Sequence, residues 1–373
     1  MSDLGPSPTV VGQPVSSGTA TGAREVSTRL PLPATVRLDS VVWLYVIPIA
    51  AIHLAALTAF IPWLFSWTGL ALAVLGVPFY GLGITLGYHR LLAHRSLTVP
   101  KWLEHGFALF AQCSLQDTPA KWVTVHRMHH VFSDEQPDPH SPLVNFLWGH
   151  FNWLFYQNTA TRTIGSMQKY AHDILQDPFY MRLEKSCLGP AVYLAHLLLY
   201  PIIGAVTGWM TTGTGMGALQ FSLSLFVWGG LVRTVLGWHA TWSVNSLTHL
   251  FGYRNYETNE GSRNNWFVAL VAVGEGWHNN HHSDPAAASV WHRWWEFDPT
   301  YCVIFLLERL GLATKVIESK TARRARRRRG VRKVEQPVAL GQSSEVVFVD
   351  LPTPPEPHRA VRRRNRDDGG RSG

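Results

Sequence analysis

Two long stretches of the chain carry no charged side chain. Residues 40–89 contain no Asp, Glu, Lys or Arg, and neither do residues 186–232. Each stretch is long enough for two crossings, since about 20 apolar residues span a bilayer once. Buried helices of a large soluble core are the alternative, but the length of the stretches and the Trp and Tyr residues near their ends favour a membrane. We therefore expect an integral membrane protein.

A break in the middle of each stretch predicts a helical hairpin. Residues 62–68 and 209–216 contain the Pro, Ser and Gly residues that favour turns. Two such hairpins give four transmembrane helices in an all-α fold. The predicted spans are residues 41–61, 69–88, 188–208 and 217–241.

The charges predict the orientation of these spans. Both hairpin loops are uncharged, and every Lys and Arg lies on the other side except Arg233, which falls inside the fourth span. Because positively charged loops stay in the cytoplasm, we expect both termini and the segments between the hairpins there. Arg233 is expected to snorkel or to pair near the cytoplasmic end of its helix. The expected location is the cytoplasmic membrane of a bacterium.

The two ends of the chain differ in composition from the part between them. Residues 1–35 are rich in Ser, Gly, Thr and Pro, and residues 320–373 hold 15 Lys or Arg against 6 Asp or Glu. We expect both to be disordered tails around a membrane domain of residues 36–319. A basic run can bind nucleic acid, but next to a membrane the expected partners are anionic lipids, and no nucleic acid.

The motif HxxHH occurs twice, once between the charge-free stretches and once after them, and two more histidines lie upstream. Residues i, i+3 and i+4 share a helix face, so each motif is expected to direct three imidazoles at one place. A single copy could be a surface patch, but two copies beside membrane spans indicate a metal site. Eight ligands are too many for one ion, so we expect two metals. These histidines are His89, His94, His126, His129, His130, His278, His281 and His282.

Spacing alone is less decisive at two other places. His89 and His94 are five residues apart and do not share a face of a straight helix, so His89 is expected to end the second span with His94 beyond a bend. Asn245 and His249 are four apart and face the same way, which makes His249 a candidate ninth ligand. A polar residue at a helix end is the alternative for His249. The remaining histidines are expected to be structural or supporting residues.

Four segments carry further motifs: GYHRLLAHRS, WVTVHRMHHVFSDEQPDPHSP, WSVNSLTH and GEGWHNNHH. In these segments the chain resembles the membrane fatty-acyl desaturase family, specifically its Δ9 or stearoyl-type branch, over about residues 40–315. The resemblance implies four transmembrane helices and a cytosolic helical cap that holds a di-iron site. It also implies that Asn245 reaches one iron through water. The metal-binding and catalytic histidines are then His89, His94, His126, His129, His130, His249, His278, His281 and His282.

The resemblance implies an O2-dependent desaturase that places a cis double bond, at Δ9, in a saturated fatty-acyl chain. Removing hydrogen from an unactivated methylene needs an oxidant stronger than any side chain, so a metal–oxygen species must carry the reaction. The resemblance implies that two iron ions and external electrons provide it. The chain has no haem-binding, Cys-rich or dinucleotide motif. We therefore expect a separate donor, such as a ferredoxin, a cytochrome or a flavin reductase. Glu275, Asp134 and Asp138 are expected to hold the imidazole tautomers.

The resemblance also implies a bent apolar tunnel for the acyl chain. Trp122 and Trp242, two of its four expected residues, could instead be interfacial aromatics on their own evidence. Asp117, Thr124 and Val125 occupy the positions that hold the CoA headgroup in animal members, so the carrier can be CoA or a lipid ester. The expected tunnel residues are Gln116, Trp122, Thr241 and Trp242.

Two other functions compete with a desaturase. A fatty-acyl or alkyl hydroxylase could use the same histidine clusters, and its product would identify it. A non-catalytic metal- or lipid-binding membrane protein is the second alternative. A metal carrier would place its ligands at the bilayer midplane, whereas these clusters lie outside the predicted spans.

Overall fold

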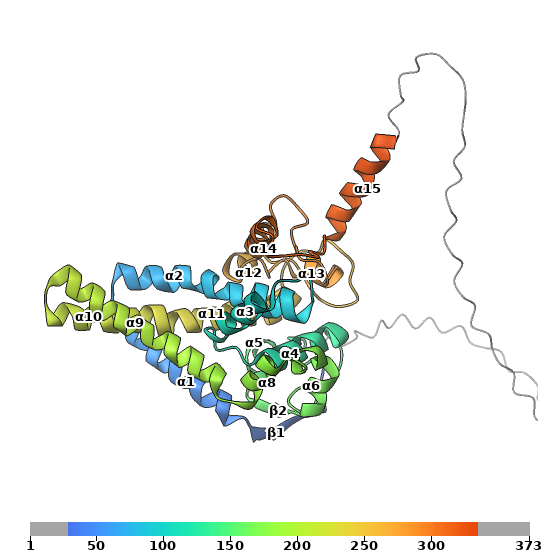
Figure 1. The fold of residues 1–373 in the computed structure, drawn as a ribbon. Coiled ribbons are helices and arrows are strands. Elements are labelled where there is room, and N and C mark those ends of the chain that lie inside the picture. The colour runs from blue at the N-terminus through green and yellow to red at the C-terminus, as the bar shows by residue number, and fades with distance from the viewer. Residues whose placement is uncertain (1–28, 335–373) are drawn as a thin grey trace, which may run out of the picture. The chain divides into compact units, whose positions relative to one another are not determined.

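The computed structural model describes residues 29–334. The compact unit that ends at Ala325 contains four helical segments that are long and apolar enough to cross a membrane. They lie side by side at one end of this unit, and shorter helices gather at the other end (Figure 1). The segments are Trp43–Phe60, Trp67–Ala93, Leu188–Thr212 and Gly215–Leu250.

Each predicted span coincides with one of these segments. The second runs farther than predicted, to Ala93, because the helix continues beyond the apolar stretch into the cap. The fourth continues to Leu250, in agreement with the expectation that Asn245 and His249 share a face of the same helix. Their parts are α1 (Trp43–Ala56) with η1 (Leu57–Phe60); α2 (Trp67–Leu82) with the π-helix η3 (Gly83–Ala93); α9 (Leu188–Thr212); and α10 (Gly215–Leu225), the π-helix η5 (Phe226–Val232) and α11 (Arg233–Leu250).

Both hairpin turns use side chains and backbone angles suited to their positions. In the first, the short helix η2 (Pro62–Leu64) leads to Ser66, whose hydroxyl accepts a hydrogen bond from Gly69 N at 2.9 Å and caps α2. In the second, Gly213 ends α9 with φ of 64°, a value that glycine adopts without strain. Thr214 then caps α10.

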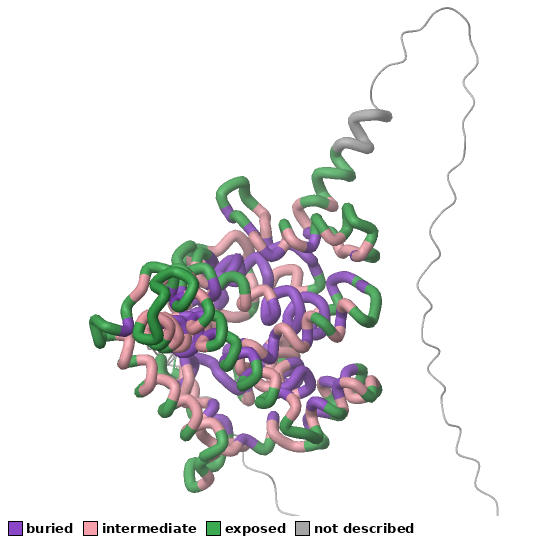
Figure 2. The backbone as a smooth tube through the Cα atoms, turned by 60° about the vertical axis from the view of Figure 1, so that its left-hand side comes forward, coloured by how far each residue is buried: buried purple, intermediate pink, exposed green. Residues whose placement is uncertain are grey.

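The spanning helices present apolar side chains outward. Leu44 on α1 and Met210 on α9 are each 79 % exposed, and α1 has no buried residue at all. Figure 2 shows the buried segments gathered between the spanning helices and within the cap. Exposed apolar faces of this extent are expected where lipid, not water, surrounds the helices. The protein is therefore a membrane protein.

The cap is built from short helices and one small sheet. The antiparallel pair β1 (Val36–Val41) and β2 (Tyr156–Asn158) departs from the all-α expectation, and a bulge interrupts its register. The helices are α3 (Lys101–Gln112), α4 (Pro119–Phe132), α5 (Phe146–His150), η4 (Asn152–Leu154), α6 (Ile164–Tyr170), α7 (His172–Leu175), α8 (Pro178–Lys185), α12 (Trp266–Val271), α13 (His278–Ser283) and α14 (Pro299–Arg309).

Parts of both predicted disordered tails, residues 29–35 and 320–334, have a defined structure. Lys320–Val334 form a helix, α15, so the prediction of disorder from residue 320 is wrong there. Arg, Ala and Lys favour helix, and Asp284 anchors the first turn by accepting from Lys320 N at 2.8 Å and from the Arg323 guanidinium at 2.9 Å. At the other end, Leu30 N donates to Leu143 O. Residues 1–28 and 335–373 lie outside the described residues.

Candidate metal centre

The spacing of His89 and His94 has a local explanation that the sequence analysis missed. His89 lies in the last turn of η3, a π-helix, and His94 is the capping residue directly after it. In a π-helix the backbone N–H of each residue bonds to the carbonyl five residues earlier. His94 N accordingly donates to His89 O at 3.0 Å. A π-helix brings residues five apart onto one face, so the prediction that a bend separates these two histidines is wrong.

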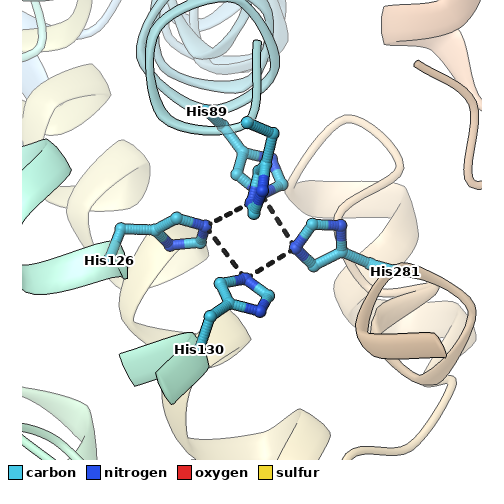
Figure 3. Close-up of side chains that lie close together, drawn as sticks. His89, His126, His130 and His281 are labelled. Carbon is cyan, nitrogen blue, oxygen red and sulfur yellow. Dashed lines mark hydrogen bonds between the residues drawn. The ribbon is translucent and has the colours of Figure 1, made fainter. Parts of the chain in front are cut away.

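Five imidazoles form the first group of candidate ligands. Their Nε2 atoms approach closely: His94 to His126 at 2.7 Å, His126 to His130 at 3.1 Å, and His130 to His281 at 2.9 Å. His89 Nε2 lies 3.1 Å from His281 Nε2. Figure 3 shows the labelled rings of His89, His126, His130 and His281 turned toward one centre. They come from η3, α4 and α13. We call this set the five-histidine group: His89, His94, His126, His130 and His281.

Four other imidazoles form a second group beside the first. His249 Nε2 lies 3.1 Å from His278 Nε2. His129 Nε2 and His282 Nε2 are buried and have no hydrogen-bond partner among the described residues. We call this set the four-histidine group: His129, His249, His278 and His282.

Each HxxHH motif is divided between the two groups, so the expectation of three convergent imidazoles per motif is wrong. Residues four apart on a helix differ by about 40° around the axis, whereas the middle histidine of the motif, three residues after the first, lies about 60° to the other side of the first. In α4, His126 and His130 enter the five-histidine group and His129 enters the other. In α13 the assignment is reversed, since His281 alone joins the five-histidine group. The sharing fits two metals held side by side.

A carboxylate lies behind one imidazole of the first group and two of the second. Glu275 is 2.8 Å from His89 Nδ1, Asp138 is 3.0 Å from His129 Nδ1, and Asp134 is 2.8 Å from His249 Nδ1. A carboxylate only accepts, so each Nδ1 carries the proton and each Nε2 keeps its lone pair. Lone pairs directed at one another are suited to a metal ion and unfavourable without one. All three carboxylates are those that sequence proximity suggested.

The electrostatics keep six of the nine ligands neutral. Burial, and then repulsion from neighbouring imidazoles, lowers the pKa of six histidines well below 6.5, so that their lone pairs are free at neutral pH. Although burial raises the pKa of Asp134, Asp138 and Glu275, the adjacent histidines more than reverse it and leave all three below the usual value. The six are His94, His126, His130, His278, His281 and His282.

Arg90 and Asp298 support the first group, and sequence analysis did not identify them. The Arg90 guanidinium is buried and donates to Glu275 Oε1 at 3.1 Å and to Asp298 Oδ2 at 2.8 Å. Glu275 in turn holds His89, so one ion-paired network joins η3, the loop before α13 and the start of α14. A charged residue directly beside His89 at the end of an apolar run was the signal available in the sequence.

A mostly apolar cavity leads to both groups. Imidazoles of both groups form part of its wall. Gln116, Trp122, Thr241 and Asn245 line it as expected, with Gln116 Nε2 donating to Thr241 Oγ1 at 3.0 Å. Trp242 is not among the lining residues: it is buried on the other face of α11, stacked on Trp238. The histidines of the wall are His89, His126, His129 and His278.

Three histidines outside the two groups form a chain of their own. His53 on α1 contacts His239 on α11 at 3.2 Å, and His239 contacts His150 on α5 at 3.0 Å. Ser246 continues the chain at 2.9 Å from His150. These contacts tie the first span to the cap, which is a structural role.

Comparison with known proteins agrees with this arrangement. The chain matches the fatty acid desaturase family over residues 61–305. It is 42 % identical over 279 residues to an sn-2 palmitoyl-lipid 9-desaturase of Nostoc sp. (strain 36), covering 74 % of this chain and 90 % of that protein. It is 40 % identical over 287 residues to an sn-1 stearoyl-lipid 9-desaturase of Anabaena variabilis, with 76 % and 96 % covered. An acyl-CoA 5-desaturase of Anemone leveillei is 40 % identical over 273 residues, with 73 % and 78 % covered. The chain therefore belongs to the fatty acid desaturase family and is a fatty-acyl desaturase of a membrane.

Proposed function

We propose that the protein is an O2-dependent acyl-lipid desaturase that places a cis double bond at position 9 of a saturated chain. One observation carries the proposal: a single apolar cavity is walled by imidazoles of both histidine groups. A hydrocarbon in that cavity would present a methylene pair to both groups. Two relatives named as 9-desaturases of stearoyl-lipid and palmitoyl-lipid support the position.

Two iron ions are the proposed cofactors, one for each histidine group, with Asn245 beside the second through water. The fit is supported by the unpartnered Nε2 atoms of His129 and His282 and by the carboxylates that fix the tautomers of His89, His129 and His249. Bound iron would supply the activation of O2 that no side chain can supply.

The remaining residues position the substrate and exclude water. Trp122 stacks on the ring of His126 at 4.9 Å between centroids, so a chain that touches Trp122 lies directly beside a ligand. The hydrogen bond from Gln116 to Thr241 joins the loop before α4 to α11 across the cavity wall. A saturated chain has no polar handle at its middle, so such fixed walls must select the methylene pair by shape.

The side chains of Asp117, Thr124 and Val125 support a lipid ester as the acyl carrier in preference to CoA. Its carboxylate accepts from Tyr45 OH at 2.8 Å and offers no cation to a phosphate. Thr124 is fully buried and donates to Ala120 O, and Val125 has no polar group. Phosphate recognition of the kind that Arg and Lys provide is therefore missing at these three positions.

Electrons are proposed to come from a separate donor on the cytoplasmic side, the side proposed for both termini as well. A second cavity, which is polar, is lined by His130 and His282 of the two groups, together with Glu260 and Lys320. It approaches the centre from outside the apolar cavity. A ferredoxin, cytochrome or flavin reductase that docks over it would reach the ligand rings without disturbing the acyl chain.

Complementation tests the proposal. A bacterial strain that cannot make unsaturated fatty acids should grow when it expresses this protein, and mass spectrometry should locate the double bond at position 9 of lipid-bound chains. His129→Ala and His281→Ala should abolish conversion, whereas His172→Ala, at an exposed histidine of α7, should not. A hydroxylated product without alkene would identify a hydroxylase, and metal binding with no product would identify a non-catalytic relative.

A further inference from the structure

Arg233 is a buried cation that faces only neutral groups. It is 2 % exposed and stands in the fourth spanning segment, which contradicts the expectation that it snorkels. Its Nη1 donates to Cys113 O at 3.1 Å and its Nε to Gly229 O at 3.2 Å. The guanidinium also lies over the ring of Tyr80, 4.5 Å from the centroid.

One nitrogen of this guanidinium makes no hydrogen bond within the described residues. Arg233 Nη2 is buried and has no hydrogen-bond acceptor among the described residues. An unpaired donor on a buried charged group is strongly unfavourable. An acceptor brought by a ligand would remove that penalty.

Arg233 lies at the inner end of the apolar cavity. Among the described residues, no lining residue precedes Val77 on α2 or Arg233 on α11. Twelve residues separate Arg233 from Asn245 at the metal centre, which is about 18 Å along the helix. The same number of residues separates Val77 from His89. The cavity thus runs between the two helices from the histidine groups to Arg233.

Thr234, the polar residue next to Arg233 in the cavity wall, is already satisfied. Its hydroxyl donates to Gly230 O at 2.7 Å and contacts Tyr193 OH at 3.1 Å. Val77, Gly81 and Ile84 supply apolar wall on the opposite side. Arg233 Nη2 is therefore a buried donor at this end of the cavity without an acceptor among residues 29–334.

We propose that Arg233 forms a hydrogen-bonding subsite for the far end of the acyl chain, which favours a chain ended by a hydroxyl over the same chain ended by a methyl. The proposal rests on the proposed function, since an acyl chain must occupy the cavity. A methyl-ended chain long enough to reach Arg233 leaves Nη2 unpaired, whereas a hydroxyl oxygen accepts from it. Chains too short to reach Arg233 should not distinguish the two ends.

Paired feeding of fatty acids tests this subsite. Cells that express the protein receive methyl-ended and ω-hydroxy fatty acids in pairs of increasing length, and mass spectrometry gives the desaturated fraction of each chain within the lipids. Wild type should convert the short pairs equally. In the longest pair it should favour the hydroxyl-ended chain about ten-fold, the factor that corresponds to 1.4 kcal/mol.

Two variants and a control assign the preference to the guanidinium. Arg233→Met keeps the length of the side chain and removes its N–H groups, so the preference should vanish and longer methyl-ended chains should be converted. Arg233→Lys retains a donor and should retain a preference. Leu236→Met, at a lipid-facing position that is 45 % exposed on the same helix, should behave as wild type.

Each outcome decides the proposal. Both substrates are measured in the same cells, so poor folding or expression cancels in their ratio. Equal conversion by wild type at every length, or a preference that survives in Arg233→Met, would overturn the subsite. If Arg233→Met makes no product, wild type and Arg233→Lys still decide the matter. Conversion of ordinary methyl-ended chains by wild type supports the proposed function in either case.

Discussion

His130 and His281 stand 151 positions apart in the chain, and their Nε2 atoms lie 2.9 Å apart. One comes from α4, before the second hairpin, and the other from α13, after it. The contact joins the two HxxHH motifs within the five-histidine group. A metal there would be held by residues from both halves of the chain.

The unequal size of the two groups predicts unequal effects of single substitutions on metal content. His129→Ala leaves three imidazoles in its group, whereas His126→Ala leaves four in the other. We expect His129→Ala to retain about one metal per chain and His126→Ala to retain closer to two, by elemental analysis of purified protein. Both should lose activity. Equal metal loss in the two variants, with His172→Ala as the unaltered control, would argue against the division of ligands described above.

Glu275→Gln should weaken metal binding while the protein still folds. The amide no longer offers a negative charge to His89 or to the buried Arg90, so the imidazole loses the partner that fixes its tautomer. We expect metal affinity to fall about 10- to 100-fold, measured by competition with a chelator. Glu257→Gln, at an exposed glutamate that lines the polar cavity, serves as the matched control. An unchanged affinity in Glu275→Gln would contradict the role of this carboxylate.

Two tryptophans should behave differently when each is replaced by phenylalanine. Trp122 lines the cavity and stacks on His126, so Trp122→Phe should shift the distribution of double-bond positions in the product. Trp242 packs against Trp238 and Leu154 instead, so Trp242→Phe should lower the melting temperature and leave the position unchanged. Product analysis by mass spectrometry separates the two. A changed double-bond position in Trp242→Phe would place that residue in the substrate path after all.

Acidification should destabilise the metal-free protein. Burial holds the pKa of six ligand histidines below the 6.5 of the unfolded chain, so the unfolded state binds more protons below that pH. Stability is therefore fully present above pH 6.5 and falls as the pH drops toward the folded pKa values. We expect the melting temperature of metal-free protein to decrease between pH 7.5 and pH 5.5. His282→Asn removes one of these groups and should show a smaller decrease, and an identical decrease would contradict the assignment.

Ending the chain at Ala325 should separate electron delivery from the chemistry. The truncation keeps the turn of α15 that Asp284 anchors and removes most of the Arg-rich segment. With an acidic protein donor we expect a higher KM and a weaker dependence on salt. With a small uncharged reductant the rate should match that of the full chain. Unchanged kinetics with the protein donor would mean that the basic segment is not its dock.

Much of this arrangement could be predicted because its signals are local. Missing charges mark the spans, Ser66 and Gly213 mark the turns, and repeated histidines mark the centre. The division of each HxxHH motif was not predictable from one helix, since it depends on where α4 and α13 lie relative to each other. The π-helix at His89 was also missed, because the composition of an apolar run does not distinguish a π-helix from an α-helix. Arg90 contacts Asp298 across the fold, and no spacing rule reports such a contact.

The exchange of histidines between the two motifs has a consequence for biogenesis. The five-histidine group needs His281, and the four-histidine group needs His278 and His282. These residues follow the fourth helix in the chain and are therefore synthesised after it. A nascent or truncated chain that lacks them possesses neither complete binding site. Completion of the two-metal centre therefore waits for finished insertion, because the four-histidine group has only two of its four imidazoles until α13 is made.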